Sequence, residues 1–355
     1  MVVLNALKTF FVDWIWKTFC VKWIWQTFFV AWIYDGFFLG FICKKLKFDK
    51  WKGWIYLSPA LVLLAIFTVW PIINTLALAF TNNAELYDRQ GTGFGIENFT
   101  KVLEYQGFLD CLKNTLLLTV LTVPLSTILA LLIAVCLNAI KPLQRFLQTI
   151  FFLPYVTNSL AIGMVFAAMF NVVGARYENG ALTSNFTLGI INNVITVLGG
   201  QPINWINSGS GYWENIAVMT IYIVWNALPF KILILLGGLQ SVNKQYYEAA
   251  KIDSTPRWRV FTRITVPLLS PMLAYVIITG FIGGFKEYSS IVGIFGEKMG
   301  APGDDGSLNT MVGFIYDALE GQHDGRASAA ALILFAIIFV VTMINLYVSK
   351  KKTHY

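Results

Sequence analysis

Long apolar stretches alternate with short polar segments along most of the chain. Six of these stretches are long enough to cross the hydrocarbon core of a bilayer, which takes about 20 apolar residues in a helix. They cover residues 54–80, 114–138, 147–171, 213–239, 268–295 and 327–348. The pattern predicts an all-α integral membrane protein with a six-span transmembrane domain over residues 54–350.

Composition agrees with this class of protein. Of the 355 residues, 57% are hydrophobic and only 13% are charged, whereas soluble domains carry about 25% charged residues. Six crossings return both ends of the domain to the same side of the membrane. We expect a multi-pass protein surrounded by membrane lipid.

Basic residues are distributed unevenly between the two sets of alternate loops, although the net charge is +7. The richer set comprises Lys44, Lys45, Lys47, Lys50, Lys52, Lys141, Arg145, Lys244, Lys251, Arg257, Arg259, Arg263, Lys350, Lys351 and Lys352. The poorer set comprises Arg89, Lys101, Lys113, Arg176, Lys298 and Arg326. Because cytoplasmic loops are enriched in Lys and Arg, we expect the richer loops and the C-terminus to be cytoplasmic. This asymmetry also argues against nucleic-acid binding.

Residues 1–45 differ from the rest of the chain. They contain a tandem nine-residue repeat, KTFFVDWIW, KTFCVKWIW and QTFFVAWIY, from Lys8 to Tyr34. Nine residues make about two and a half turns of helix, so successive copies face opposite ways. We expect an additional tryptophan-rich, membrane-associated helix before the six-span core. Whether it spans the membrane or lies on it stays open.

A polar, basic loop over residues 240–267 interrupts the apolar pattern between the fourth and fifth stretches. Ser241 or Asn243 can cap a short helix at its start. Ser254 and the following Thr-Pro pair predict a break and a new helix, because proline is tolerated in a first turn. Pro267 and Pro271 then bend the chain back into the bilayer.

The short helix has the properties of a mechanical coupling element. Ala249 and Ala250 carry almost no side chain, so another protein could approach the backbone closely, and Glu248 provides an anionic group beside them. The same tripeptide is also good helix-forming composition.

The longer pattern, Glu248-Ala249-Ala250 followed by Asp253 and the two prolines, resembles the EAA loop of binding-protein-dependent ABC transporter permeases. The surroundings are similar to the sugar-importing, MalF-like branch. The resemblance covers about residues 54–350, and its other segments read YLSPALVLLAIFTVWPII, GIENFTKVL, LPYVTNSLAIGMVF and FIYDALE. It implies that Glu248, Ala249, Ala250, Asp253 and Ser254 couple to an ATPase. The family usually has glycine where Ser254 stands, and serine enters positive φ less cheaply.

The resemblance also implies the protein's partners and location. The chain would be one permease subunit of an ATP-driven importer of a di- or oligosaccharide in a bacterial cytoplasmic membrane. A second, related permease and two ATPase subunits, which hold ATP and Mg, would complete the importer. An extracellular or periplasmic binding protein would deliver the sugar. Rotation of the permeases would alternate access between the two sides.

Several polar and aromatic residues lie deep in the predicted spans, where burying a polar group costs free energy unless a partner or a ligand binds it. Trp225 and Asn226 fall in the fourth stretch, and Phe285, Lys286, Glu287 and Tyr288 fall in the fifth. Charges at such depth normally face a water-filled cavity or pair internally, and polar groups can also serve as helix-packing contacts. We expect these six residues to line the substrate path. Lys231, close to the end of its stretch, is expected to extend to the interface.

Other functions remain as alternatives. The cargo could be glycerol phosphate, an amino acid or a peptide, or the chain could be an ion-coupled secondary transporter or a non-transporting scaffold or enzyme. The sequence contains no Gly-Lys-Ser/Thr, so we expect no ATP hydrolysis by this chain. Neither the two histidines nor Cys20, Cys43, Cys111 and Cys136 show metal-site spacing, and we expect no metal, cofactor or catalytic residue.

Overall fold

The computed structural model describes residues 52–82, 93–140, 144–173, 177–178, 181–182 and 187–352. It divides the chain into two units, Met1–Asn74 and Thr75–Tyr355, which are described separately. The repeat helix expected over residues 1–45 lies outside the described residues.

The first unit contains helix α5 (Lys52–Leu64), a π-helical turn (Ala65–Val69) and the beginning of α6 (Trp70–Ala79). These segments follow one another without a break. The stretch Tyr56–Ala79 is long and apolar enough to cross a membrane. It corresponds to the first predicted span.

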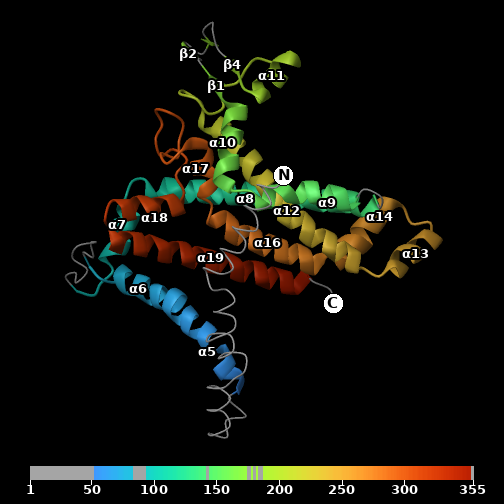
Figure 1. Cartoon of the computed structure of the whole chain (residues 1–355), viewed down its shortest axis with the longest axis horizontal. Coiled ribbons are helices and arrows are strands. Elements are labelled where there is room, and N and C mark those ends of the chain that lie inside the picture. Colours follow the sequence, from blue (N-terminus) through green and yellow to red (C-terminus); the bar gives the residue numbers. More distant parts are fainter. Residues whose placement is uncertain are drawn as a thin grey trace, which may run out of the picture. The chain divides into compact units, whose positions relative to one another are not determined.

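The second unit is built on four helices that lie side by side, α8 (Phe108–Ala139), α12 (Tyr212–Ser241), α16 (Ser270–Phe285) and α19 (Asp324–Lys352) (Figure 1). Ala130 and Ala134 of α8 are fully buried in a cluster with Leu235 of α12 and Val276 of α16. Small residues at a contact let helix backbones approach closely. This packing fixes three of the four helices against one another.

Shorter helices connect the long ones: α7 (Glu97–Glu104), α9 (Gln144–Val156), α10 (Ser159–Phe170), α11 (Ile190–Val197), α13 (Lys244–Ile252), α14 (Arg257–Val260), a π-helical turn (Phe261–Thr265), α15 (Val266–Leu268), α17 (Ser289–Phe295) and α18 (Met311–Glu320). Two antiparallel ladders lie between α10 and α11. β1 (Val172–Val173) pairs with β4 (Thr187–Leu188), and β2 (Tyr177–Glu178) pairs with β3 (Ala181–Leu182).

Two of the predicted spans are bent rather than continuous. The third consists of α9 and α10, which meet at 99°. Helix α9 ends at Val156, and Asn158 caps the start of α10 by accepting a hydrogen bond from the Leu160 amide. The helices before and after Leu269 meet at 68°. Four helices are long and apolar enough to cross a membrane, and the described chain has up to six spans if each bent pair counts as one.

The predicted fifth span also ends early. Helix α16 stops at Phe285 and the chain turns into α17, which packs against α10. Gly163 and Gly293 make this crossing possible, since a Cβ at Gly163 would lie 2.7 Å from the Gly293 Cα. The early end coincides with the polar residues Lys286, Glu287 and Tyr288, and the close contact of Gly163 with Gly293 lets α17 pack on α10.

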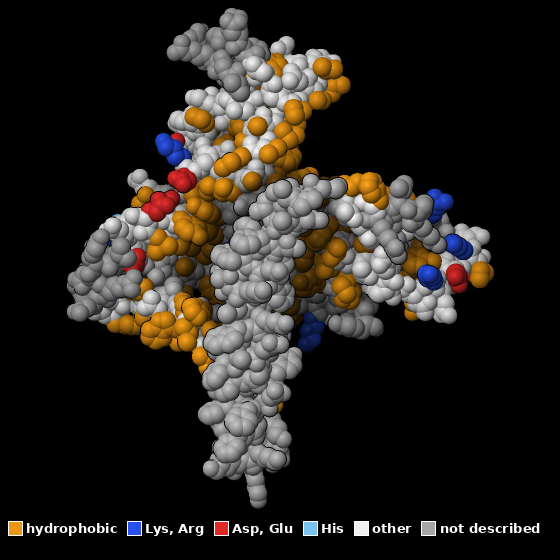
Figure 2. Space-filling view, in the orientation of Figure 1, with side chains coloured by type: hydrophobic (Ala, Val, Ile, Leu, Met, Phe, Trp, Pro, Cys, Tyr) orange, Lys and Arg blue, Asp and Glu red, His pale blue; other side chains and the backbone are white. Residues whose placement is uncertain are grey.

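The two ends of the second unit differ. Helices α13 and α14 lie at one, the coupling-loop end, while α7 and α18 lie at the other, the far end (Figure 1). Helix α19 runs from the far end to the coupling-loop end (Figure 1). Lys and Arg side chains gather over α13 and α14, and acidic side chains lie around the loop between α17 and α18 (Figure 2).

Candidate functional site

The coupling helix α13 begins as the sequence predicts. Asn243 is the residue before it, and its Oδ1 accepts a hydrogen bond from the Gln245 amide at 3.0 Å. This bond satisfies one of the amides that a helix start leaves without a partner. Of the two predicted capping residues, Asn243 is the one used, whereas the Ser241 hydroxyl donates to the Gly238 carbonyl.

The end of α13 is a Schellman motif. The Thr255 amide donates to the Ala250 carbonyl at 2.9 Å, and the Ser254 amide donates to the Lys251 carbonyl at 3.1 Å. This motif requires a left-handed residue, normally glycine, just after the helix. Ser254 has φ of 48°, so serine adopts the conformation that glycine would adopt here. The turn is therefore kept at a conformational cost.

Two large apolar side chains are exposed on the coupling loop among its basic residues. Ile252 is 85% and Trp258 is 73% exposed, and Glu248 and Ala249 are exposed beside them. Ala250 is buried, in contrast to the expectation that both alanines permit close approach. A groove of about 530 Å³, with Arg257 among its lining residues, lies between α13 and the segment that follows it. Ala249 is thus accessible on the surface of the loop, whereas Ala250 belongs to its internal packing.

A cavity of about 290 Å³ lies between α8, α9, α12 and α16. It is lined by Thr122, Val123, Ser126, Tyr155, Ile223, Asn226, Ala227, Phe230, Lys231, Thr279, Gly280, Gly283, Gly284 and Glu287. Tyr155 and Phe230 stack with ring centroids 5.9 Å apart and planes 19° apart. The cavity therefore combines an aromatic pair with amide, hydroxyl and charged groups.

The structure brings together two of the six residues predicted to line the path. Asn226 and the half-buried Glu287 line the same cavity. Glu287 Oε1 accepts a hydrogen bond from the Ser290 amide at 3.2 Å. This bond places the carboxylate at the beginning of α17, where the exposed amides of a helix favour negative charge.

The other four predicted path residues lie elsewhere. Trp225 packs on Phe166 at 5.0 Å between ring centroids, on the α10 side of α12. Phe285 is buried in the cluster between α8, α18 and α19. The Tyr288 ring stacks on Tyr316 at 4.6 Å, and Lys286 is exposed at the end of α16.

The expectation for Lys231 is wrong. Its side chain does not extend to an interface, because the residue is only 4% exposed. The Nζ atom donates to the Val123 carbonyl at 3.2 Å, to Ser126 Oγ at 2.7 Å and to Thr127 Oγ1 at 3.0 Å. Helix α8 thus offers three oxygens at the level of Lys231, and the ammonium group binds there.

Residues 112–354 match the family described as "Binding-protein-dependent transport system inner membrane component". The chain belongs to this family. It is therefore a transport permease subunit and not itself an enzyme, and its apolar helices belong to a multi-pass membrane protein.

Two curated permeases match most of the chain. The lactose transport system permease protein LacF of Rhizobium radiobacter is 28% identical over 299 residues, which cover 82% of this chain and 91% of LacF. The probable ABC transporter permease protein MG188 of Mycoplasma genitalium is 30% identical over 290 residues, which cover 81% of this chain and 82% of MG188.

A solved structure has the same fold. It is a bacterial ABC transporter involved in the import of the acidic polysaccharide alginate. The TM-score is 0.69 at 20% identity, with 88% of this chain and 99% of the other covered. The permease fold is thus shared over nearly the whole length of the solved chain.

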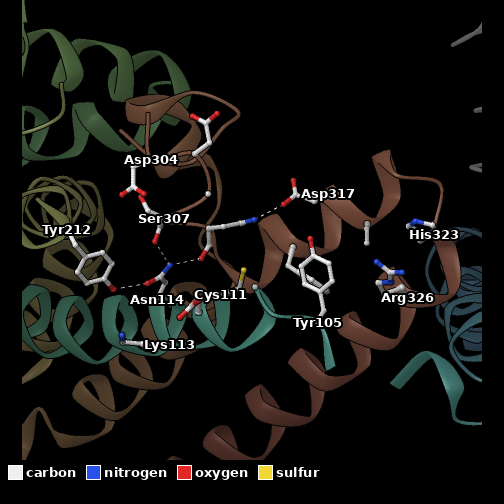
Figure 3. A pocket seen from close by; sticks show the side chains of 17 residues that line it. Tyr105, Cys111, Lys113, Asn114, Tyr212, Asp304, Ser307, Asp317, His323 and Arg326 are labelled. Atoms are coloured by element: carbon white, nitrogen blue, oxygen red, sulfur yellow. Dashed lines mark hydrogen bonds between the residues drawn. The ribbon is translucent and has the colours of Figure 1, made fainter. Parts of the chain in front are cut away.

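At its far end the permease has a larger pocket, of about 790 Å³ (Figure 3). Asn114 of α8 connects the walls of this pocket by hydrogen bonds. Its Nδ2 atom donates to the carbonyls of Ser307 and Asn309, each at 2.9 Å. The Tyr212 hydroxyl of α12 donates to Asn114 Oδ1 at 2.7 Å. Asp110, Asp304, Asp305 and Asp317 lie around the pocket with Lys113, His323 and Arg326.

Charge in the far-end loop is partly compensated. Lys298 Nζ lies 2.8 Å from Asp305 Oδ2, and this hydrogen bond and the charge of Asp305 raise the pKa of Lys298. Within the described residues, no group of three or more His, Cys, Asp or Glu side chains could hold a metal ion.

The polar face of α8 was not among the features predicted from the sequence. Thr115, Thr119, Thr122 and Ser126 are buried, and each hydroxyl donates to the carbonyl four residues earlier. Their spacing of three or four residues is a helical face, and it was visible in the second apolar stretch. Tyr155 of α9 carried no such signal, because a single tyrosine in an apolar stretch is common at a membrane interface.

Proposed function

We propose that the chain is one permease subunit of an ATP-driven importer of a di- or oligosaccharide. The names of LacF and of the alginate importer support a sugar as cargo. A second, related permease and two ATPase subunits complete the importer, and ATP and Mg bind to the ATPases. A binding protein delivers the sugar from outside the cell.

The cavity between α8, α9, α12 and α16 carries this proposal. Sugar sites combine flat apolar surfaces, which face the C–H side of a ring, with hydrogen-bonding groups at the ring edge. Tyr155 and Phe230 provide the first, and Asn226 and Glu287 provide the second. A volume of about 290 Å³ is at the lower end for ligand cavities. The cavity therefore holds only part of a di- or oligosaccharide at once, and successive parts of the sugar pass through it in turn.

The coupling loop is joined directly to this cavity. Helix α12 carries Asn226 and ends at Ser241, only two residues before α13 begins. Helix α16 lines the opposite wall and follows the coupling loop through α14 and α15. An ATPase that moves α13 therefore moves two walls of the cavity, which is the rigid-body movement that alternating access requires.

The uneven distribution of basic residues supports an orientation. Lys244, Lys251, Arg257, Arg259 and Arg263 are exposed at the coupling-loop end. Because such residues stay in the cytoplasm, the coupling loop and the C-terminus face the cytoplasm. The far-end pocket then faces the binding protein.

Reconstitution tests the proposal. The permease is purified with its natural partner subunits in lipid, and ATPase stimulation is measured with the binding protein across a panel of sugars, amino acids, peptides and glycerol phosphate. We expect stimulation by a di- or oligosaccharide. Stimulation by members of another class alone would overturn the assignment of sugar as cargo.

A matched pair of variants locates the path. Asn226→Ala should weaken transport and leave basal ATPase activity unchanged, because Asn226 lines the cavity. Asn193→Ala is the control, since Asn193 is exposed on α11, where its Nδ2 donates to the Leu188 carbonyl. Equal transport by the two variants would exclude Asn226 from the path.

A further inference from the structure

Lys231 places a positive charge at the wall of the cavity. Its three N–H groups donate to three oxygens of α8, so it has no donor left for a ligand. Among the described residues, no carboxylate lies within ion-pair distance of it. The charge is held in place by these oxygens and not by an ion pair.

Helix α8 does not need this lysine. The Ser126 hydroxyl also donates to the Thr122 carbonyl at 2.6 Å, and the Thr127 hydroxyl donates to the Val123 carbonyl at 2.7 Å. Both hydroxyls would keep partners if residue 231 were apolar. Because a charge inside a membrane protein is costly and normally functional, the charge itself requires an explanation.

Two glycines of α16 give the charge access to the cavity. A Cβ at Gly280 would lie 3.2 Å from Lys231 Nζ, so the ammonium group sits where a side chain would otherwise be. Gly283 lies about one helical turn further along α16 and a Cβ there would meet no atom within 4 Å. Glu287 is about a further turn away, towards the far end, and is bound to the beginning of α17.

We propose that Lys231 is a specificity-determining residue for the cargo. Its fixed positive charge lets the coupling-loop end of the cavity accept neutral and anionic sugar groups and reject free ammonium groups. The proposal rests on the proposed function, in that the cavity lies on the path of the cargo. Recognition is by charge alone, because every N–H of Lys231 is already engaged.

Thiol reagents of opposite charge test this directly, without the cargo. The four native cysteines are first replaced by serine, and Gly283→Cys then introduces a thiol into the open part of the cavity. The full importer is treated with a sulfonate-bearing and with a trimethylammonium-bearing methanethiosulfonate. We expect the ratio of anionic to cationic reaction rates to fall about tenfold in Lys231→Met, because unit charges interact more strongly near a protein interior than in water.

Three controls make the result specific to charge. Lys231→Gln should lower the ratio as Lys231→Met does, and Lys231→Arg should keep it. The same ratio at Gly237→Cys should not change, since Gly237 also has open space but lines a different cavity of α12. A constant Gly237→Cys rate also shows that the variants remain folded.

An unchanged ratio at Gly283→Cys in both neutral variants would overturn the proposal and leave Lys231 as a link between α8 and α12. The outcome is independent of which solute is transported. If the ratio falls but no sugar stimulates the ATPase, the proposed function fails while the charge selectivity of the cavity stands.

Discussion

The coupling loop and the cavity, the two regions for which we propose a function, are built in opposite ways. The coupling loop is formed by residues that are close together in sequence, since its cap, helix, left-handed turn and second helix follow one another between Asn243 and Leu268. The cavity is assembled from four helices, and Thr122 lies across it from Gly284 although more than a hundred residues separate them. Neighbouring residues therefore determine the first region, and tertiary packing determines the second.

The two regions also differ in where they place side chains whose surroundings cost free energy. The coupling loop exposes the apolar side chains of Ile252 and Trp258 to water. This exposure costs free energy unless a partner covers the side chains. The cavity instead hides a charge, Lys231, among oxygens of its own chain. The coupling loop therefore leaves large apolar side chains exposed, whereas the cavity satisfies its buried charge within the chain.

The largest expected effects come from the coupling loop. Ala249→Trp and Glu248→Lys should both abolish transport, because they put a bulky ring or a reversed charge on the exposed face of α13. Ala250→Trp should abolish transport for another reason, since the ring cannot fit at a buried position and the loop must unfold locally. Uptake assays measure the loss in each case.

Limited proteolysis distinguishes the two reasons. Ala250→Trp should increase cleavage near the basic residues of the loop, whereas Ala249→Trp should leave the cleavage pattern unchanged. Normal transport by Ala249→Trp with ATPases bound would show that α13 is not the docking element. Equal cleavage of all three variants would contradict the inward orientation of Ala250.

This difference explains what the sequence could and could not predict. A cap at Ser241 or Asn243 and a break at Ser254 were readable because each depends on a few adjacent residues, and the structure uses Asn243. The positive φ of Ser254 was not predicted from adjacent residues, and only the glycine that the family usually has at this position pointed to it. The bend between α9 and α10 was not readable either, since Asn158 in an apolar stretch gives no sign that the next helix turns through 99°.

The cavity was only half predicted for the same reason. Asn226 and Glu287 are conspicuous as polar residues in apolar stretches, and both line it. Trp225 is equally conspicuous in the sequence. However, its ring packs on Phe166 of α10, and the position of α10 cannot be read from the residues around Trp225. Lys231 was misjudged because its partners are hydroxyls on α8, which is far away in sequence.

A smaller effect is expected from removal of the cavity aromatic. Tyr155→Ala should weaken apparent transport affinity by about 1–3 kcal/mol, by analogy with other aromatic anchors in recognition. The residue is half exposed, lines the cavity and stacks on Phe230, so its loss should leave assembly and basal ATPase activity intact. Concentration-dependent uptake measures the change.

Trp225→Ala is the matched comparison, since Trp225 is the aromatic residue of α12 that the sequence led us to expect in the substrate path. Its ring packs between α12 and α10 on Phe166, with Tyr222 beside it. We therefore expect a lower thermal midpoint for this variant and little change in transport affinity per folded molecule. A large affinity change in Trp225→Ala with none in Tyr155→Ala would return Trp225 to the substrate path.

The smallest expected effect is at Ser254, where local conformation acts alone. A non-glycine residue in the left-handed conformation destabilises the folded chain by about 1–2 kcal/mol. Glycine avoids this strain, but its greater conformational entropy in the unfolded chain offsets part of the gain in stability. Ser254→Gly should therefore stabilise the end of α13 by about 0.5 kcal/mol, seen as roughly twofold slower exchange of the Thr255 amide, which donates to the Ala250 carbonyl. Asp253→Gly is the control: φ there is −74°, so glycine relieves no strain and exchange should become faster. Slower exchange in both variants would mean that the cost lies elsewhere than in the φ of Ser254.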